Sequence, residues 1–207
     1  MFTFVKQSIL QTKQTGAVWP SGRRLARTMT SPLLDSKGPR RILEVGPGTG
    51  VFTREICKQL RPDDTYDIVE INPTFCRHVE QKVLPRHIDP KNLHQVRIHC
   101  DSLENVVLEP GYDHVFCGLP FNNFEPWLVR SLFRKMISLM AEEGTLSFFE
   151  YIGVRMMRAP LVGRSGRKRS TDIERINKSL RRRFHGRREA VLCNIPPAYA
   201  VHLQPVA

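Results

Sequence analysis

The sequence predicts an α/β fold in which a mostly parallel, seven-stranded sheet carries helices on both faces. Strand and helix patterns alternate between residues 41 and 152, which favours parallel strands joined by crossover helices. The first strand pattern is an apolar run, as in a buried strand. The last two strand patterns follow each other closely, which predicts an antiparallel hairpin at one edge. The predicted strands are 41–45, 66–71, 96–99, 114–117, 145–152, 188–194 and 199–203.

Four helices are expected among these strands. Pro73 suits the first turn of one, which places Val79 and Val83 on a shared face and stops before Pro85. A longer amphipathic run follows the fourth strand and is expected to end near Gly144. The predicted helices are 53–60, 73–84, 125–140 and 171–184, and the Arg- and Gly-rich residues 154–170 are predicted to form a loop.

The composition fits one globular domain with an uneven distribution of charge. The 207 residues are 41% hydrophobic, which excludes wholesale disorder. Basic residues outnumber acidic ones by 32 to 20, and the excess lies in residues 1–41 and 154–188. Such segments usually contact phosphate, either of nucleic acid or of an anionic membrane. We therefore expect an N-terminal helical segment at 1–40, packed on the core, and a main domain at 41–207 with a basic insertion at 154–188.

Several classes of protein are disfavoured. No window of 18 residues is apolar and uncharged, so no membrane-spanning helix is expected. The five cysteines form no CxxC pair, which is typical of thiols in a reducing compartment. The seven histidines form no ligand pattern, so no metal site is expected. The first 34 residues contain no acidic residue, as is typical of transit peptides. A secretory signal is not expected, because no apolar region is followed by a small-residue cleavage site.

A glycine-rich segment between the first strand and the first helix predicts a nucleoside site. Gly46, Gly48 and Gly50 allow a tight turn and close approach of a ligand to the backbone. Glu70 ends the next strand, 20 residues after Gly50, where a carboxylate can accept hydrogen bonds from both hydroxyls of a ribose. Val51 stands where a dinucleotide fingerprint would place another glycine, which argues against a dinucleotide.

The run Glu44-Val45-Gly46-Pro47-Gly48-Thr49-Gly50 resembles motif I of class I S-adenosylmethionine-dependent methyltransferases. The resemblance implies a Rossmann-like fold with S-adenosylmethionine as the cofactor. It also implies that Glu44 helps to hold the methionine part and that Asp101-Ser102, after the third strand, meets the adenine amine. The cofactor-binding residues expected on this basis are Glu44, Gly46, Gly48, Gly50, Glu70, Ile71, Asp101, Ser102, Gly118 and Leu119.

The segment 118–124, Gly-Leu-Pro-Phe-Asn-Asn-Phe, follows the fourth strand, where ligands of open α/β sheets bind. It is similar to the Asn-Leu-Pro-Tyr motif of ribosomal RNA adenine dimethyltransferases, except at Gly118. Methylation of adenine N6 requires an acceptor for the amine protons, and Gly118 has no side chain to supply one. An RNA adenine N6-methyltransferase is therefore kept as the alternative function.

Other motifs are the N-terminal Thr-Gly-Ala-Val-Trp-Pro-Ser at 15–21, the aromatic fifth strand and Asn-Ile-Pro-Pro-Ala at 194–198. With the glycine loop, they resemble the soluble bacterial phospholipid N-methyltransferases that act on phosphatidylethanolamine, and their ornithine-lipid relatives, over nearly the whole chain. The resemblance implies methylation of the amine of a membrane lipid headgroup. It also implies a cytoplasmic protein that associates peripherally with the membrane.

An amine must lose its proton before it attacks a methyl group, because a primary ammonium titrates near ~10. Glu150, in an otherwise apolar strand, is the first candidate for the base. Tyr151, Asn123 and Tyr199 are the other candidates near the acceptor, and the two tyrosine rings suit contact with a cationic amine.

Two segments are candidates for contact with an anionic membrane. Phe2, Val5 and Ile9 form an apolar stripe flanked by lysines, as in an interfacial helix. The Arg-rich residues 164–183 suit anionic headgroups, and they also suit RNA phosphates. Aromatic residues do not alternate with these arginines as they do in single-strand binders, which favours lipid.

Overall fold

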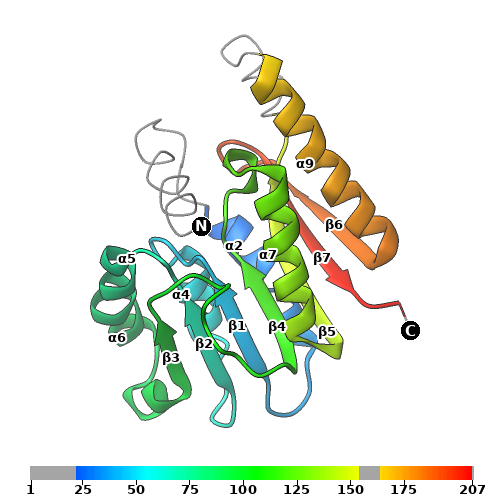
Figure 1. Cartoon of the computed structure of the whole chain (residues 1–207). Coiled ribbons are helices and arrows are strands. Elements are labelled where there is room, and N and C mark those ends of the chain that lie inside the picture. The colour runs from blue at the N-terminus through cyan, green and yellow to red at the C-terminus, as the bar shows by residue number, and fades with distance from the viewer. Residues whose placement is uncertain (1–21, 154–163, 207) are drawn as a thin grey trace.

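The computed structural model describes residues 22–153 and 164–206. Its strands are β1 (Arg41–Val45), β2 (Thr65–Val69), β3 (Val96–His99), β4 (Tyr112–Cys117), β5 (Met140–Tyr151), β6 (His185–Val191) and β7 (Ala198–Gln204). They form one sheet in the order β3-β2-β1-β4-β5-β7-β6 (Figure 1). β1 to β5 run parallel, and β7 is antiparallel to both β5 and β6. The predicted sheet, with its antiparallel edge hairpin, is confirmed.

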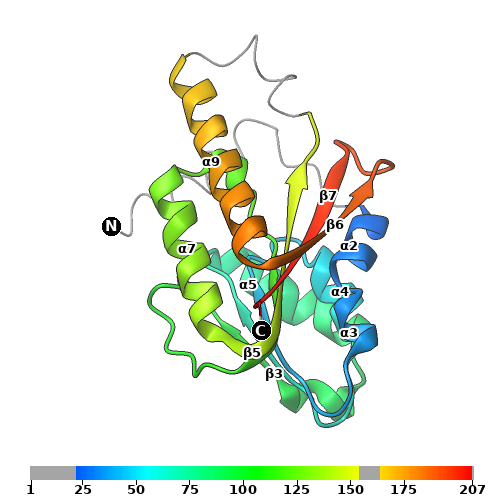
Figure 2. The same ribbon diagram turned by 90° about the vertical axis from the view of Figure 1, so that its right-hand side faces the viewer.

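Helices cover both faces of this sheet, as predicted. The helices are α2 (Arg23–Met29), α3 (Pro32–Asp35), α4 (Val51–Cys57), α5 (Pro73–His78), α6 (Leu84–His87), α7 (Pro126–Leu139) and α9 (Arg164–Arg183), with the π-helical η1 (Val79–Val83) and the 3-10 helices η2 (Pro90–Gln95) and η3 (Phe121–Asn123). α7 and α9 lie on one face, and α2, α3 and α4 lie on the other (Figure 2).

Each face of the sheet buries its own apolar layer. Phe121, Phe133 and Phe148 are nearly inaccessible between the sheet and α7, with ring centroids 4.7 to 6.3 Å apart. On the other face, Phe52 and Ile56 of α4 pack in a second layer that includes Leu25, Ala26 and Met29 of α2. These α2 side chains are fully buried, so α2 is part of the packed fold.

The register of the central strands brings three motifs together. Val45 pairs with Val69 of β2 and with Cys117 of β4. The residues that follow these three, Gly46, Glu70 and Gly118, therefore leave the sheet at the same edge. This is the carboxyl edge of the parallel strands, where such folds bind ligands.

The predicted loop at 154–170 is wrong in its second half, because α9 begins at Arg164. Arginine, lysine and serine are acceptable in helices, and burial of Gly166 in the folded chain outweighs its low helix propensity. Residues 154–163 lie outside the described part of the chain.

Two other predicted ends also differ. The helical path does not stop before Pro85 but continues through η1 into α6. η1 is π-helical, so the usual hydrogen-bond ladder is already interrupted where Pro85 lacks an N–H. α7 ends at Leu139 and not near Gly144, which instead lies in β5 close against the Tyr112 carbonyl oxygen. Smaller shifts occur in the hairpin, since β6 begins at His185 rather than at residue 188.

None of the helices that the structure describes is long and apolar enough to cross a bilayer. The predicted apolar stripe of Phe2, Val5 and Ile9 lies outside the described residues.

Candidate functional site

The glycine loop between β1 and α4 is held by a buried carboxylate. Gly46, Gly48 and Gly50 all have positive φ, between 55° and 75°, a region that glycine enters without strain. Glu70 is 5% exposed, and its Oε2 accepts a hydrogen bond from the Gly48 N–H at 3.1 Å. Its Oε1 accepts one from the Asn72 N–H at 2.8 Å. Glu70 thus fixes the turn of the loop and also faces the space beside it.

A narrow cavity opens next to this loop and gathers six of the predicted cofactor-binding residues. Its free volume is only about 30 Å³. Asp101, at its rim, accepts hydrogen bonds from the Ser102 N–H at 2.6 Å and from Asn105 Nδ2 at 3.0 Å. The lining residues are Val45, Gly46, Val69, Glu70, Ile71, Asp101, Ser102, Leu103, Glu104, Leu119, Phe124 and Leu132.

Glu44 does not line this cavity; it is fully buried between α4 and β2. Its Oε2 accepts a hydrogen bond from Thr53 Oγ1 at 2.8 Å and another from the Tyr66 hydroxyl. Its Oε1 has no hydrogen-bond partner among the described residues. Burial raises the pKa of Glu44 to about 7, although both hydroxyl donors oppose that shift.

The end of β4 approaches the loop too closely for a side chain. A Cβ on Gly118 would lie 2.4 Å from the carbonyl oxygen of Gly46. The next residue, Leu119, covers the loop, because its Cδ2 would be 2.4 Å from a Cβ on Gly46. Gly118 is therefore required by the backbone packing of this chain.

The four candidates for acceptor chemistry do not share one place. Glu150 of β5 and Tyr199 of β7 are cross-strand partners, and Arg181 of α9 donates a hydrogen bond to Glu150. The Arg188 guanidinium lies 4.0 Å from the centroid of the Tyr199 ring. Burial raises the pKa of Glu150, while Arg181 and Arg188 oppose that shift. Sequence reasoning missed both arginine contacts; the only signal was the arginine cluster near the end of the predicted helix.

Tyr151 and Asn123 lie apart from this pair. Tyr151 follows Glu150 in β5, so it faces the opposite side of the sheet, where its ring is 5.1 Å from that of Phe149. Asn123 ends η3, directly after the loop that carries Leu119.

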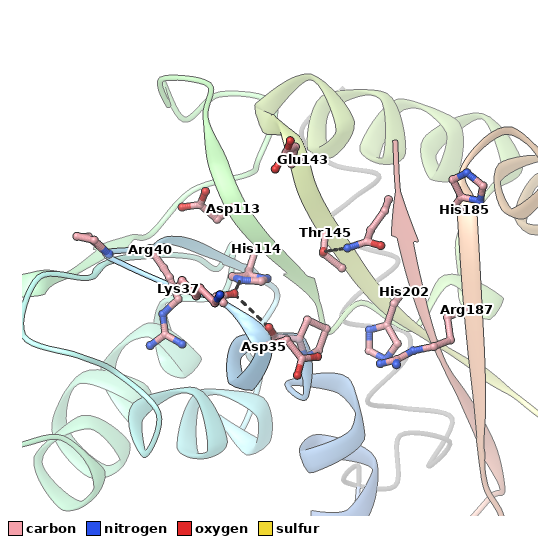
Figure 3. A pocket seen from close by; sticks show the side chains of 14 residues that line it. Asp35, Lys37, Arg40, Asp113, His114, Glu143, Thr145, His185, Arg187 and His202 are labelled. Atoms are coloured by element: carbon pink, nitrogen blue, oxygen red, sulfur yellow. Dashed lines mark hydrogen bonds between the residues drawn. The ribbon is translucent and has the colours of Figure 1, made fainter. Parts of the chain in front are cut away.

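A much larger cavity, about 460 Å³, lies at the opposite edge of the sheet (Figure 3). It is formed where β4 and β5 begin, and it includes His114 and His202. Burial lowers the pKa of each to about 4, so both rings are neutral at pH 7. None of the predicted site residues lines it. Among the described residues, no cluster of His, Cys, Asp and Glu is suited to hold a metal.

Comparison with known proteins identifies the family of this chain. Residues 43–146, which span the glycine loop, Glu70, Asp101 and Gly118, match a family described as a methyltransferase domain. The chain belongs to this family. S-adenosylmethionine is its cofactor.

Two curated relatives of this methyltransferase chain differ in their reactions. Ornithine lipid N-methyltransferase of Singulisphaera acidiphila is 30% identical over 131 residues, which are 62% of this chain and 66% of the relative. Malonyl-[acyl-carrier protein] O-methyltransferase 1 of Ilyobacter polytropus is 30% identical over 113 residues, 55% of this chain and 38% of the relative. The chain thus spans less than two thirds of either protein.

Solved structures support the fold. The O-methyltransferase TomG from Streptomyces achromogenes, solved in complex with S-adenosylmethionine, superposes with a TM-score of 0.66. The superposition covers 97% of this chain and 89% of TomG at 13% identity, so it shows the Rossmann-like methyltransferase fold alone.

The residues of this methyltransferase fit its cofactor. A buried carboxylate, Glu70, faces the cavity. Gly46 and Gly118 have no side chain, which allows their backbones to lie close together beside it. The unpartnered Oε1 of Glu44 leaves one buried acceptor beneath the loop. The small free volume results partly from Leu119, which covers the loop at Gly46.

Proposed function

We propose that this chain transfers a methyl group from S-adenosylmethionine to the amine of a membrane lipid headgroup, of the phosphatidylethanolamine or ornithine-lipid type. The observation that carries the proposal is the 30% identity to an ornithine lipid N-methyltransferase over 131 residues. The O-methyltransferase relative matches a shorter stretch. We extend to this chain neither that relative's substrate nor its oxygen acceptor.

Each cofactor-binding residue has a proposed role. Glu70, 5% exposed in the cavity, accepts hydrogen bonds from the ribose hydroxyls, while its existing bonds to the backbone N–H groups of Gly48 and Asn72 keep its carboxylate oriented. The Asp101 carboxylate and the Ser102 backbone meet the adenine amine edge, between the apolar walls of Ile71 and Leu119. Entry of the nucleoside requires Leu119 to turn away from Gly46. The glycine loop passes beside the methionine part, and Glu44 supports that loop from beneath.

Bound S-adenosylmethionine supplies an electrophilic methyl group on a sulfonium, and the residues of this chain must present a neutral nucleophile to it. Positioning supplies most of the rate of such a displacement. We propose Glu150 as the base that takes a proton from the lipid ammonium, because burial raises its pKa toward that of the amine. Tyr199, its cross-strand partner, offers a ring face to the cation once Arg188, which lies 4.0 Å from the ring centroid, moves away.

The alternative, methylation of adenine N6 in RNA, is disfavoured by Gly118. That reaction requires a side-chain acceptor at this position, and a side chain at 118 would collide with the Gly46 carbonyl. Asn123 lies five residues further along, in η3.

A lipid substrate requires contact with a membrane surface. We propose that α9 provides it on the cytoplasmic side, since Lys168, Lys178, Arg182 and Arg183 are exposed on this helix. The N-terminal stripe of Phe2, Val5 and Ile9 is proposed to insert into the same membrane.

The test offers purified protein and labelled S-adenosylmethionine to two acceptors in parallel. One is a set of anionic vesicles that contain phosphatidylethanolamine or ornithine lipid, and the other is unmethylated total RNA. We expect label in the lipid fraction, with successive products that count the methyl groups. Label in RNA alone would overturn the proposal, as would label in neither acceptor when binding of S-adenosylhomocysteine is intact.

A further inference from the structure

A second cavity, of about 360 Å³, lies between α2, α4, η1 and α6. It is separate from the cofactor cavity, because the two share no lining residue. Cationic side chains dominate its wall, and they come from three separate stretches of the chain: α2, α4 with Lys58 after it, and the continuous η1–α6 path. The lining residues are Arg23, Val51, Arg54, Glu55, Lys58, Lys82, Arg86 and His87.

The one carboxylate in this wall does not neutralise it. Glu55 already pairs with Lys58 at 2.6 Å and with Arg27 at 3.8 Å. Neither Arg23, Lys82 nor Arg86 has a carboxylate at ion-pair distance among the described residues. Residues 1–21 and 154–163 contain no Asp or Glu, so their side chains supply no missing partner.

Four of the five Arg and Lys side chains in this wall therefore have no carboxylate partner among the described residues. Arg54 donates to the Thr49 carbonyl oxygen at 3.3 Å, a neutral acceptor that leaves its charge unpaired. The pKa of His87 responds to these charges. Burial lowers it, and Arg54, Lys58 and Arg86 lower it further, while Glu55 opposes the shift. Like charges gathered around a hollow repel one another, and a bound anion would remove that repulsion.

We propose that this cavity binds a phosphate group, carried either by a lipid headgroup or by a small soluble compound. Arg23, Arg54 and Arg86 supply planar guanidinium groups that match phosphate oxygens, and Lys82 adds a point charge. Several unpaired cations require more than the single charge of a carboxylate, and a phosphomonoester carries up to two. A hollow of this size admits a small anionic group, whereas a nucleic-acid duplex needs an extended surface.

The assignment is independent of the methyl acceptor, and binding tests it without turnover. Wild-type protein is titrated with inorganic pyrophosphate by calorimetry, and separately with phosphatidylcholine vesicles that contain phosphatidate. The variant K82Q/R86Q removes two exposed cations from the wall. The matched control K91Q/R130Q removes two exposed cations that do not line the cavity. Thermal unfolding verifies that both variants are folded, and R23Q/R54Q replaces K82Q/R86Q if that variant is not.

We expect K82Q/R86Q to weaken phosphate binding about tenfold or more, as loss of two charge-assisted contacts should, and the control to bind as the wild type does. Binding should weaken with added salt, and the His87 ring resonances should shift on saturation. Binding of pyrophosphate alone would assign the site to a soluble phosphate, and binding of vesicles alone would assign it to a lipid headgroup. Either result supports the proposal.

Four results would overturn it. The first is no binding of either probe to the wild type. The second is an equal loss in K82Q/R86Q and in the control, which would indicate unspecific attraction by net charge. The third is a loss of S-adenosylhomocysteine affinity in K82Q/R86Q as large as its loss of phosphate affinity, which would make the cavity part of the cofactor site. A single-stranded RNA that competes at lower concentration than pyrophosphate would likewise show a nucleic-acid surface instead.

Discussion

At the scale of single residues, ionisation of Glu44 makes the stability of the fold depend on pH. Burial raises the pKa of its carboxyl to about 7, from 4.5. Between these values the folded state holds a proton that the unfolded chain has lost, so stability falls as pH rises through this window and is level above it. The loss is about 3 kcal/mol in free energy of unfolding.

Glu44→Gln should remove this dependence, because the amide does not ionise. We expect the free energies of unfolding of the variant, from chemical denaturation at about pH 5 and about pH 8, to differ by less than those of the wild type. If both proteins lose equal stability across this range, another group causes the effect.

Glu150 and Arg181 form an ion pair that allows two roles to be separated. If Glu150 takes the proton of the amine, Glu150→Gln should lower the methyl-transfer rate by about 10²–10⁴-fold. Arg181→Met should retain turnover but move the acid limb of the pH profile to higher pH, because Arg181 lowers the pKa of Glu150. An equal loss in both variants, with unchanged pH profiles, would mean that the pair only fixes α9 on the sheet.

The sequence predicted residues of the site wherever a motif follows a strand. Glu70 and Asp101 line the cavity, and Gly118 lies against Gly46, because parallel strands align their carboxyl ends. The contacts of Glu44 with Thr53 and Tyr66, and that of Glu150 with Arg181, were not predictable. Each joins two elements whose relative rotation depends on packing, which local patterns do not encode.

At the scale of elements, Asn194 ties α2 to the turn between β6 and β7. It is 3% exposed; its Oδ1 accepts a hydrogen bond from the Gly22 N–H at 2.7 Å, and its Nδ2 donates to the Pro196 carbonyl at 2.7 Å. Asn194→Ala should lower the free energy of unfolding by about 1–3 kcal/mol, because the Gly22 N–H is left without its acceptor. Leu192→Ala, at an exposed site of the same turn, should change it by less than about 0.5 kcal/mol in the same denaturation assay. If both substitutions changed the free energy of unfolding equally, the hydrogen bonds of Asn194 would add no specific stability.

This contact also explains why element types were easier to predict than element ends. The motif at 194–198 was visible in the sequence, but its contact with Gly22 spans 172 positions. Similarly, apolar spacing predicted a helix from 171, whereas the first turns of α9 carry mainly basic residues and have no apolar periodicity.

At the scale of the whole molecule, the proposed membrane contact uses the N-terminal segment and α9 together. Deletion of residues 2–13 should weaken binding to anionic vesicles, because it removes the apolar stripe and two lysines. Arg182→Gln with Arg183→Gln should weaken it through charge alone, by about 1 kcal/mol per residue. Vesicle flotation at low and at high salt separates the apolar contribution to membrane binding from the electrostatic one, since salt screens only the electrostatic contribution. Unchanged vesicle binding and lipid turnover after the deletion would rule out anchoring by the N-terminal segment.

The parallel sheet, its edge hairpin and the helices on both faces were predicted from the alternation of patterns along the chain, whereas the strand order and the basic cavity were not. Four of its five Arg and Lys residues lie within residues 42–153, which are acidic overall, and only the packing of α2 on α4 and α6 brings them together with Arg23.

The contact between Gly118 and the Gly46 carbonyl has a consequence for how this protein can change. The segment that begins at Gly118 and the cofactor loop touch through backbone atoms. Any side chain gained at 118 must therefore displace the loop by more than a rotamer change can absorb. A mutational route to a new acceptor therefore passes through variants with altered cofactor affinity. Selection or design for a different substrate must change both segments together, because no single substitution at 118 separates the two properties.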